Sequence, residues 1–250
     1  MRIIARLDIK NNNLIKGINL EGLKIVGSPN TFAKKYYDEG IDELIFMDSV
    51  ASLYGRNNLY EIIHEASKDI FIPITVGGGI RNIDDAIKAF NSGADKITIN
   101  TAAVENPSLI DNLSKRFGSQ SLVLSLEAKR IENDNWEVFT NNGREETGLN
   151  VVKWVKEAVS RGIGEILLTS VDMEGTRKGF DFDLIEKVVK CTQVPVIASG
   201  GFGTPDHMIK AFSHCLVDAI AIADAFHFNR FKIKDLKKIA KEQNFIVREV

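Results

Sequence analysis

The sequence predicts an α/β fold, a single (β/α)8 TIM barrel that contains an internal half-barrel duplication, and three observations carry that prediction. The chain has 250 residues, which is typical of one such domain. Short apolar segments alternate with amphipathic segments along the chain, as expected of parallel strands separated by helices. Several motifs also occur twice, about 120 residues apart. We therefore expect one domain over residues 1–250, built from half-barrels of about 1–120 and 121–250.

Eight segments are expected to form the barrel strands, because each is apolar on both faces and separated from the next by a helical pattern. In chain order they are Ile3–Ile9, Glu43–Met47, Ile72–Val76, Lys96–Ile99, Ser121–Leu126, Glu165–Thr169, Val194–Ala198 and Ala219–Ala223. Apolar residues at helical spacing predict helices at Thr31–Glu39, Ile83–Ser92, Pro107–Phe117 and Val151–Arg161. Two insertions, Lys10–Pro29 and Arg130–Gly148, follow the first and fifth strands. In the second, Trp136–Thr140 before Asn141-Asn142-Gly143 predicts a hairpin.

The repeat places one carboxylate in each half at the end of a strand. Leu7-Asp8-Ile9-Lys10 recurs as Leu126-Glu127-Ala128-Lys129. In a closed barrel of eight strands, the first and fifth strands lie opposite each other, so Asp8 and Glu127 should face each other across the mouth. Such a pair can act as general acid and general base. The alternative is that each carboxylate only forms an ion pair with Lys10 or Lys129.

Glycine loops also occur once in each half and predict two phosphate subsites. Gly78 and Gly79 follow the third strand, and Gly200 and Gly201 follow the seventh. Backbone N–H groups exposed by such loops can bind phosphate oxygens, although simple tight turns would use glycine in the same way. The first subsite is completed by the next strand end, Asn100-Thr101, and the second by Ala223-Asp224, where the acidic side chain disfavours an anion. Together the two subsites suggest a substrate with two phosphates.

Lys16 lies in the first insertion, where a mobile cation could close over the substrate, or where a lysine could simply be solvated. Cys191 and Cys215 have no metal-ligand spacing, and the four histidines are scattered, so we expect no metal and no cofactor. The net charge of −2 gives no reason to expect nucleic acid binding. The amino-terminal segment is a short strand without a signal sequence or a membrane span, so we expect no membrane association and a cytoplasmic location.

Nearly the whole chain resembles the cyclase subunit of imidazole glycerol phosphate synthase. The motifs that carry the resemblance are Leu7–Lys10, Val76–Ile80, Ile99–Pro107, Phe117–Gln120, Ala128–Arg130, Ile166–Asp172 and Ile197–Gly201. The resemblance implies a lyase of histidine biosynthesis that converts phosphoribulosyl-formimino aminoimidazole-carboxamide ribonucleotide and ammonia into imidazole glycerol phosphate and aminoimidazole-carboxamide ribotide. It implies Asp8 and Glu127 as the acid–base pair, and a substrate site that includes Thr169 and Asp172.

The resemblance further implies a glutaminase partner that delivers ammonia through the barrel. Arg2, Glu43, Lys96 and Glu165 begin four strands and match the family's salt-bridged ammonia gate at the bottom of the barrel. Asp95, beside them, would lie at the partner interface. Without the family, four alternating charges at strand beginnings would equally indicate a cluster that only stabilises the bottom face.

Two departures from the family pattern support an alternative function. Glu127 stands where the family has aspartate, and Arg6 stands where it has cysteine. One extra methylene can misplace a catalytic carboxylate while the barrel and the gate stay intact. The alternative is a paralogous ammonia-conducting barrel, which with its glutaminase supplies ammonia to a sugar amidotransferase that forms acetamidino sugars for surface polysaccharides.

Overall fold

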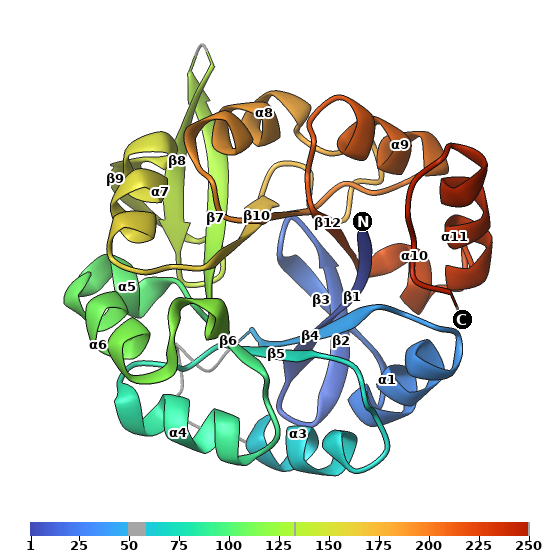
Figure 1. Ribbon diagram of the computed structural model, residues 1–250, viewed down its shortest axis with the longest axis horizontal. Coiled ribbons are helices and arrows are strands. Elements are labelled where there is room, and N and C mark those ends of the chain that lie inside the picture. The colour runs from blue at the N-terminus through green and yellow to red at the C-terminus, as the bar shows by residue number, and fades with distance from the viewer. Residues whose placement is uncertain (50–58, 133, 250) are drawn as a thin grey trace.

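A closed parallel barrel forms the centre of the molecule (Figure 1). The computed structural model describes residues 1–49, 59–132 and 134–249. Within these ranges the barrel strands are β1 (Arg2–Lys10), β4 (Glu43–Asp48), β5 (Ile74–Gly77), β6 (Lys96–Ile99), β7 (Leu122–Glu132), β10 (Glu165–Ser170), β11 (Val196–Ser199) and β12 (Ala219–Ile222). Each strand pairs with the next, β12 pairs with β1, and β10 pairs with β7, which closes the barrel. The predicted fold class is confirmed.

Helices surround the barrel on all sides (Figure 1). They are α1 (Pro29–Asp38), α3 (Leu59–Ser67), α4 (Ile83–Asn91), α5 (Thr101–Glu105), α6 (Ser108–Phe117), α7 (Val151–Ser160), α8 (Phe182–Cys191), α9 (Pro205–Ser213), α10 (Asp224–His227) and α11 (Ile233–Glu242). Polar side chains begin several of them by accepting a backbone N–H of the first turn, as Asn82 does for α4 and Asn150 for α7. In the described ranges, no helix is both long and apolar enough to cross a membrane.

Two prolines explain where the structure shortens the predicted strands. The third and seventh strands were expected from Ile72 and Val194, but β5 and β11 begin at Ile74 and Val196. Pro73 and Pro195 precede them, and proline has no N–H to donate to a strand ladder. Their carbonyls still accept, at 3.0 and 2.9 Å, from the neighbouring strands β4 and β10. Both barrel strands therefore begin directly after a proline.

Both insertions form antiparallel strands at the mouth of the barrel. The predicted hairpin is confirmed as β8 (Asn135–Thr140) and β9 (Glu145–Asn150), and β8 pairs with the extended end of β7. The first insertion, for which no strands were predicted, forms β2 (Asn13–Ile18) and β3 (Glu21–Gly27) in the same way beside β1. The β7–β8 hairpin extends beyond the ring of helices (Figure 1).

The strand register repeats between the two halves. Glu43 of β4 pairs with Ile4 of β1, and Glu165 of β10 pairs with Val123 of β7. Counting four residues onward from Ile4 and from Val123 reaches the two carboxylates predicted at the mouth. These carboxylates therefore occupy equivalent places, as the sequence repeat predicts. The boundary between half-barrels near residue 120 stays a prediction.

A second, smaller core fills the lumen of the barrel, separate from the large core between strands and helices. Its members are buried side chains that point inward from six strands: Ile4, Ile45, Met47, Val123, Leu167, Ile197, Ala219 and Ala221. Inward-facing residues of a barrel stack in layers. The lumen core therefore lies between the strand beginnings, where the predicted gate is, and the mouth.

Candidate active site

Arg6 is the partner of Asp8 at the mouth. The Arg6 Nε donates to Asp8 Oδ1 at 2.9 Å, and both side chains are almost completely buried. Burial opposes ionisation of the carboxyl, but the Arg6 and Lys16 cations outweigh burial and lower the pKa of Asp8. The ion-pair partner of Asp8 is therefore Arg6, the residue that departs from the family pattern, and not Lys10 as the alternative expectation had it. Asp8 is held as an anion.

Glu127 has the opposite protonation behaviour. Its side chain is buried, and Oε2 accepts from Asn100 Nδ2 at 3.1 Å and from the Gly143 backbone N–H at 2.8 Å. Burial raises the pKa of Glu127 to about 7, although these hydrogen bonds favour the anion. Lys129, its expected alternative partner, lies over the Phe139 ring at 5.4 Å. Two carboxylates whose environments separate their pKa values are typical of an acid–base pair.

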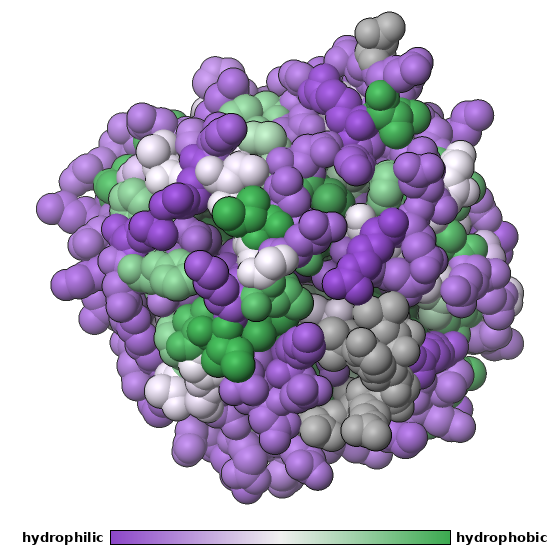
Figure 2. Space-filling view, turned by 180° about the vertical axis from the view of Figure 1, so that it is seen from behind, coloured by the Kyte–Doolittle hydropathy of each residue, from purple (hydrophilic) through white to green (hydrophobic). Residues whose placement is uncertain are grey.

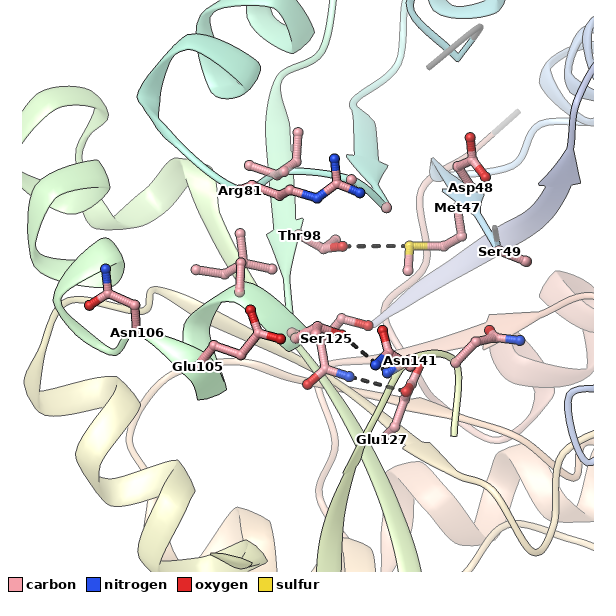
Figure 3. A pocket seen from close by; sticks show the side chains of 18 residues that line it. Met47, Asp48, Ser49, Arg81, Thr98, Glu105, Asn106, Ser125, Glu127 and Asn141 are labelled. Atoms are coloured by element: carbon pink, nitrogen blue, oxygen red, sulfur yellow. Dashed lines mark hydrogen bonds between the residues drawn. The ribbon is translucent and has the colours of Figure 1, made fainter. Parts of the chain in front are cut away.

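An open cavity of about 310 Å³ adjoins Glu127 on the side of the first phosphate subsite (Figure 3). Gly78, Gly79, Asn100 and Thr101, the predicted members of that subsite, all line it. Side chains from the barrel interior also line it, namely Met47, Thr98 and Ser125, and Thr98 Oγ1 donates to Met47 Sδ at 3.5 Å. The cavity therefore joins the first subsite to Glu127 and to the upper end of the lumen.

Glycine is required in the same way at the two predicted loops. Gly78 and Gly200 both have φ of +92°. A Cβ on Gly78 would lie 2.3 Å from the carbonyl oxygen of Asp48, and a Cβ on Gly200 would lie 2.8 Å from that of Ser170. Each loop thus packs against the end of the preceding strand and needs a residue without a side chain.

The second phosphate subsite, in contrast, is almost filled. Gly200, Gly201, Ala223 and Asp224 line a cavity of about 20 Å³, which has room for about one water molecule. The Asp224 carboxylate forms ion pairs at the outer edge, with Arg230 Nε at 2.9 Å. The sequence suggested two subsites at symmetric places, and the structure shows a large cavity at the first and a nearly filled one at the second.

Lys16 accounts for part of this closure. It lies in strand β2, and its buried ammonium forms an ion pair with the buried carboxylate of Glu174. Here it is a buried residue of the second subsite and is not solvated, and its movement over a substrate stays a prediction. Arg6 lines the same cavity and donates to Thr169 Oγ1 at 2.9 Å and to Ser199 Oγ at 3.3 Å.

The remaining predicted site residues hold the hairpins in place. Asp172 Oδ2 accepts from the Arg130 backbone N–H at 2.8 Å, which ties the loop after β10 to β7. Thr101 Oγ1 accepts from the Asn141 backbone N–H at 3.1 Å, which ties the β8–β9 turn to α5. Sequence analysis missed Gly143 as a donor and Glu174 as an anion of the site. No local signal in the sequence shows that the segment of Glu174 reaches the second subsite. The hairpin turn that contains Gly143 does indicate that Gly143 lies near the end of the fifth strand, where Glu127 is.

The four charges predicted at the strand beginnings form a closed ring at the other end of the barrel. Arg2 donates to Glu43 and to Glu165, both at 2.7 Å. Lys96 donates to the same two carboxylates, at 3.3 Å and 2.7 Å. The predicted ring of ion pairs is confirmed, and its role as a gate stays a prediction. Asp95 is exposed beside it, and its Oδ2 accepts from the Ile74 backbone N–H at 2.8 Å.

Apolar side chains are exposed at both ends of the barrel. Phe71 and Leu216 precede β5 and β12, and Ile246 follows α11; they are 77%, 68% and 89% exposed. Ile18 and Ile25 on the β2–β3 hairpin are 62% and 70% exposed. The side opposite to that of Figure 1 is mainly hydrophilic, with separate apolar patches (Figure 2). Phe71 and Leu216 thus add exposed apolar side chains shortly before strand beginnings, at the end of the barrel that carries the ion-pair ring.

Comparisons with known proteins agree with this architecture. Residues 2–232 match a family described as histidine biosynthesis protein. A relative from Legionella pneumophila, named imidazole glycerol phosphate synthase subunit HisF, is 61% identical over 203 residues, which are 81% of this chain and 96% of the relative. Relatives of the same name from Metallosphaera sedula and Bacillus cereus are 44% and 42% identical over 247 residues, which cover 99% of this chain and 98% of each relative.

Proposed function

Because the chain belongs to the histidine biosynthesis protein family, we propose that it is the cyclase subunit of imidazole glycerol phosphate synthase. It would convert phosphoribulosyl-formimino aminoimidazole-carboxamide ribonucleotide and ammonia into imidazole glycerol phosphate and aminoimidazole-carboxamide ribotide. The observation that carries the proposal is the pair Asp8 and Glu127, two buried carboxylates at equivalent strand positions whose pKa values move in opposite directions.

The protonation states assign a role to each carboxylate. Asp8 stays ionised and is suited to accept a proton from the nitrogen that ammonia brings. Glu127, with a pKa of about 7, carries a proton on part of the molecules at neutral pH and can donate it to a leaving nitrogen. The open cavity beside Glu127 gives the substrate access, and its first subsite would hold one phosphate. The second phosphate would bind at Gly200 and Gly201.

The other end of the barrel supports a source of ammonia outside this chain. The ion-pair ring closes the strand beginnings, and the apolar lumen core lies behind it. Exposed Phe71, Leu216 and Ile246, with Asp95, provide a surface on which a glutaminase subunit can dock. Ammonia released there would pass the ring and the lumen to reach Glu127. A cytoplasmic location stays a prediction.

The test is ammonia-dependent turnover of the phosphoribulosyl substrate. Asp8→Asn should reduce turnover by a factor of roughly 100 or more, the scale expected for loss of a general acid–base group. Glu127→Asp should retain or improve turnover, because it restores the shorter carboxylate of the family. Asp111→Asn on the surface of α6 is a matched control that should leave turnover unchanged. Wild-type protein without any ammonia-dependent turnover would contradict the proposal.

One observation favours the ammonia-conducting barrel as a second candidate. Arg6 engages Asp8, and the second subsite has no room for a phosphate in this conformation. A conduit needs neither, since it uses only the ring, the lumen and its partner surfaces. In that case the wild type would cyclise little, while still stimulating a glutaminase and passing ammonia to a sugar-modifying enzyme. Turnover at ordinary enzyme rates would end this second candidate. No turnover in either wild type or Glu127→Asp would end the first.

A further inference from the structure

The Glu174 carboxylate lies against the second glycine loop. A Cβ built on Gly200 would be 3.2 Å from Glu174 Oε2, so one carboxylate oxygen lies at the surface of that loop. The other oxygen, Oε1, accepts from Lys16 Nζ. Both side chains of this ion pair are only 5% exposed, and both line the 20 Å³ cavity together with Gly200, Gly201 and Arg6. The protein thus places an anion of its own where the second phosphate was predicted.

The first glycine of each loop does not account for the difference between the two subsites. Gly78 and Gly200 have the same φ and pack in the same way on the preceding strand. At the second loop the Gly179 carbonyl oxygen also approaches Gly201, where a Cβ would lie 1.9 Å from it.

The side chains differ as well. By the strand register, Asp8 in the first half is the counterpart of Glu127 in the second, and Arg6 is likewise the counterpart of Ser125. The small Ser125 lines the large cavity, while Arg6 lines the small one. Among the described residues, long charged side chains therefore contribute to filling the second subsite, and a small side chain lines the first.

Charge makes the closure selective. A buried ammonium requires an anionic partner, because leaving it unpaired in a low-dielectric site is strongly unfavourable. Lys16 has such a partner in Glu174, and a phosphate oxygen offers Lys16 the same kind of charge-assisted hydrogen bond. A phosphate and the Glu174 carboxylate would also repel each other if both lay beside Lys16 in this cavity. The two anions therefore compete for one place.

We propose that the Glu174 carboxylate is a built-in anion of the second phosphate subsite, so that a single phosphate group binds at the first subsite and a second binds only by displacing Glu174 from Lys16. This inference rests on the proposed function, because both subsites belong to that substrate site. It makes Glu174 a specificity-determining residue: ligands with one phosphate enter freely, and ligands with two must first move an ion pair.

The test uses inorganic phosphate as the probe, with calorimetric titration for stoichiometry and phosphate-soaked crystals for position. Wild type should bind one phosphate, at Gly78, Gly79 and Thr101. Glu174→Gln removes the charge at nearly constant volume, and should bind a second phosphate at Gly200 and Gly201 at least about tenfold more tightly than wild type does. The matched control is Glu186→Gln, which removes a carboxylate of α8 that pairs with Lys190 and lines neither subsite, and it should bind one phosphate.

Two results would overturn the inference: two phosphates bound by wild type with Glu174 still paired to Lys16, or no added phosphate in Glu174→Gln. Glu174→Asp is a second variant in case Glu174→Gln does not fold. It keeps the negative charge but places it one methylene farther from Lys16. It should bind the second phosphate with an affinity between those of wild type and Glu174→Gln, and affinity equal to wild type would count against the inference. Phosphate stoichiometry is measured without turnover, so failure of the cyclase assay leaves this result readable.

Discussion

Arg6 and Asp8 form a buried ion pair in which each charge depends on the other for stabilisation. Their side chains are 3% and 7% exposed, so removal of one charge leaves the other buried without its partner. Asp8→Asn should therefore lower the free energy of unfolding by about 3–5 kcal/mol. The double variant Asp8→Asn with Arg6→Met should recover most of this loss, because it removes both charges. Urea denaturation measures each value.

The control for this pair is Asp38→Asn, which breaks the exposed ion pair between Lys34 and Asp38 on α1. It should leave stability almost unchanged, because exposed ion pairs contribute little. Equal stability of Asp8→Asn and wild type would show that the Arg6 charge is satisfied by other groups, of which Thr169 and Ser199 are the nearest.

Glu127 should make stability depend on pH in a defined window. Its pKa rises from an ordinary 4.5 to about 7 on folding, so between these values the folded state holds a proton that the unfolded state has lost. Stability then falls as the pH rises from 4.5 to 7. Glu127→Gln removes this dependence. Its stability relative to wild type should therefore increase across the window, by up to about 3 kcal/mol. Thermal or urea unfolding at pH 4.5 and pH 8 measures it, and an unchanged difference would refute the raised pKa.

Among the elements, the β7–β8 hairpin is joined to the start of α8 by several polar contacts, and both Trp136 and Arg130 donate to the Asp181 carboxylate. Trp136 Nε1 donates to Asp181 Oδ2 at 2.8 Å, and Asp181 Oδ1 also accepts from the Leu184 N–H as the first cap of α8. Trp136→Phe should cost about 1 kcal/mol of stability, the scale of one hydrogen bond. Asp181→Ala should cost about 2 kcal/mol, because it removes the same bond and a helix cap, while the half-exposed ion pair with Arg130 that is lost with them contributes little. Chemical denaturation measures both.

Asn82→Ala is the control for the cap alone. Its side chain begins α4 by accepting the Asp85 N–H at 2.9 Å, without a link to a hairpin, and its loss should cost about 1 kcal/mol. If Asp181→Ala and Asn82→Ala proved equally destabilising, the link between Trp136 and Asp181 would contribute nothing.

The elements were predictable to the extent that local patterns determine them. The apolar strands and the turn Asn141-Asn142-Gly143 have local signals, and they are found where the sequence predicts them. The closure of the second subsite has no local signal, because it depends on Lys16 and Glu174, which are 158 residues apart. Arg6 was visible as a departure from a family pattern, but its bond to Asp8 depends on side-chain direction inside the barrel. The repeat predicts subsites at equivalent places, and individual long side chains help to make them unequal.

For the whole molecule, a variant of the ion-pair ring can show whether the ring is an ammonia gate or only a structural cluster. Lys96→Ala removes one of the two cations that bridge Glu43 and Glu165. If the ring gates ammonia, this variant should uncouple glutamine hydrolysis from ammonia use and spare the reaction with added ammonium salts. The measurement is the ratio of glutamine hydrolysed to product formed in the complex with a glutaminase.

Lys156→Ala on the exposed side of α7 is the matched control, since it removes a lysine that lies on a helix outside the barrel and is not a member of the ring. It should keep the ratio of wild type. Unchanged coupling in Lys96→Ala would mean that the ring only stabilises the bottom of the barrel.

The ion-pair ring is also a place where the two halves, equivalent in strand register, differ in charge. By the strand register, Glu165 is the counterpart of Glu43, whereas the counterparts of Arg2 and Lys96 are Ser121 and Ala219. Two identical first halves would have carried four cations and two carboxylates at this end, a net charge of +2. The present ring, with two of each, is neutral. The first half thus contributes a net charge of +1 to the ring and the second a net charge of −1, so the ring is neutral only when both halves are present.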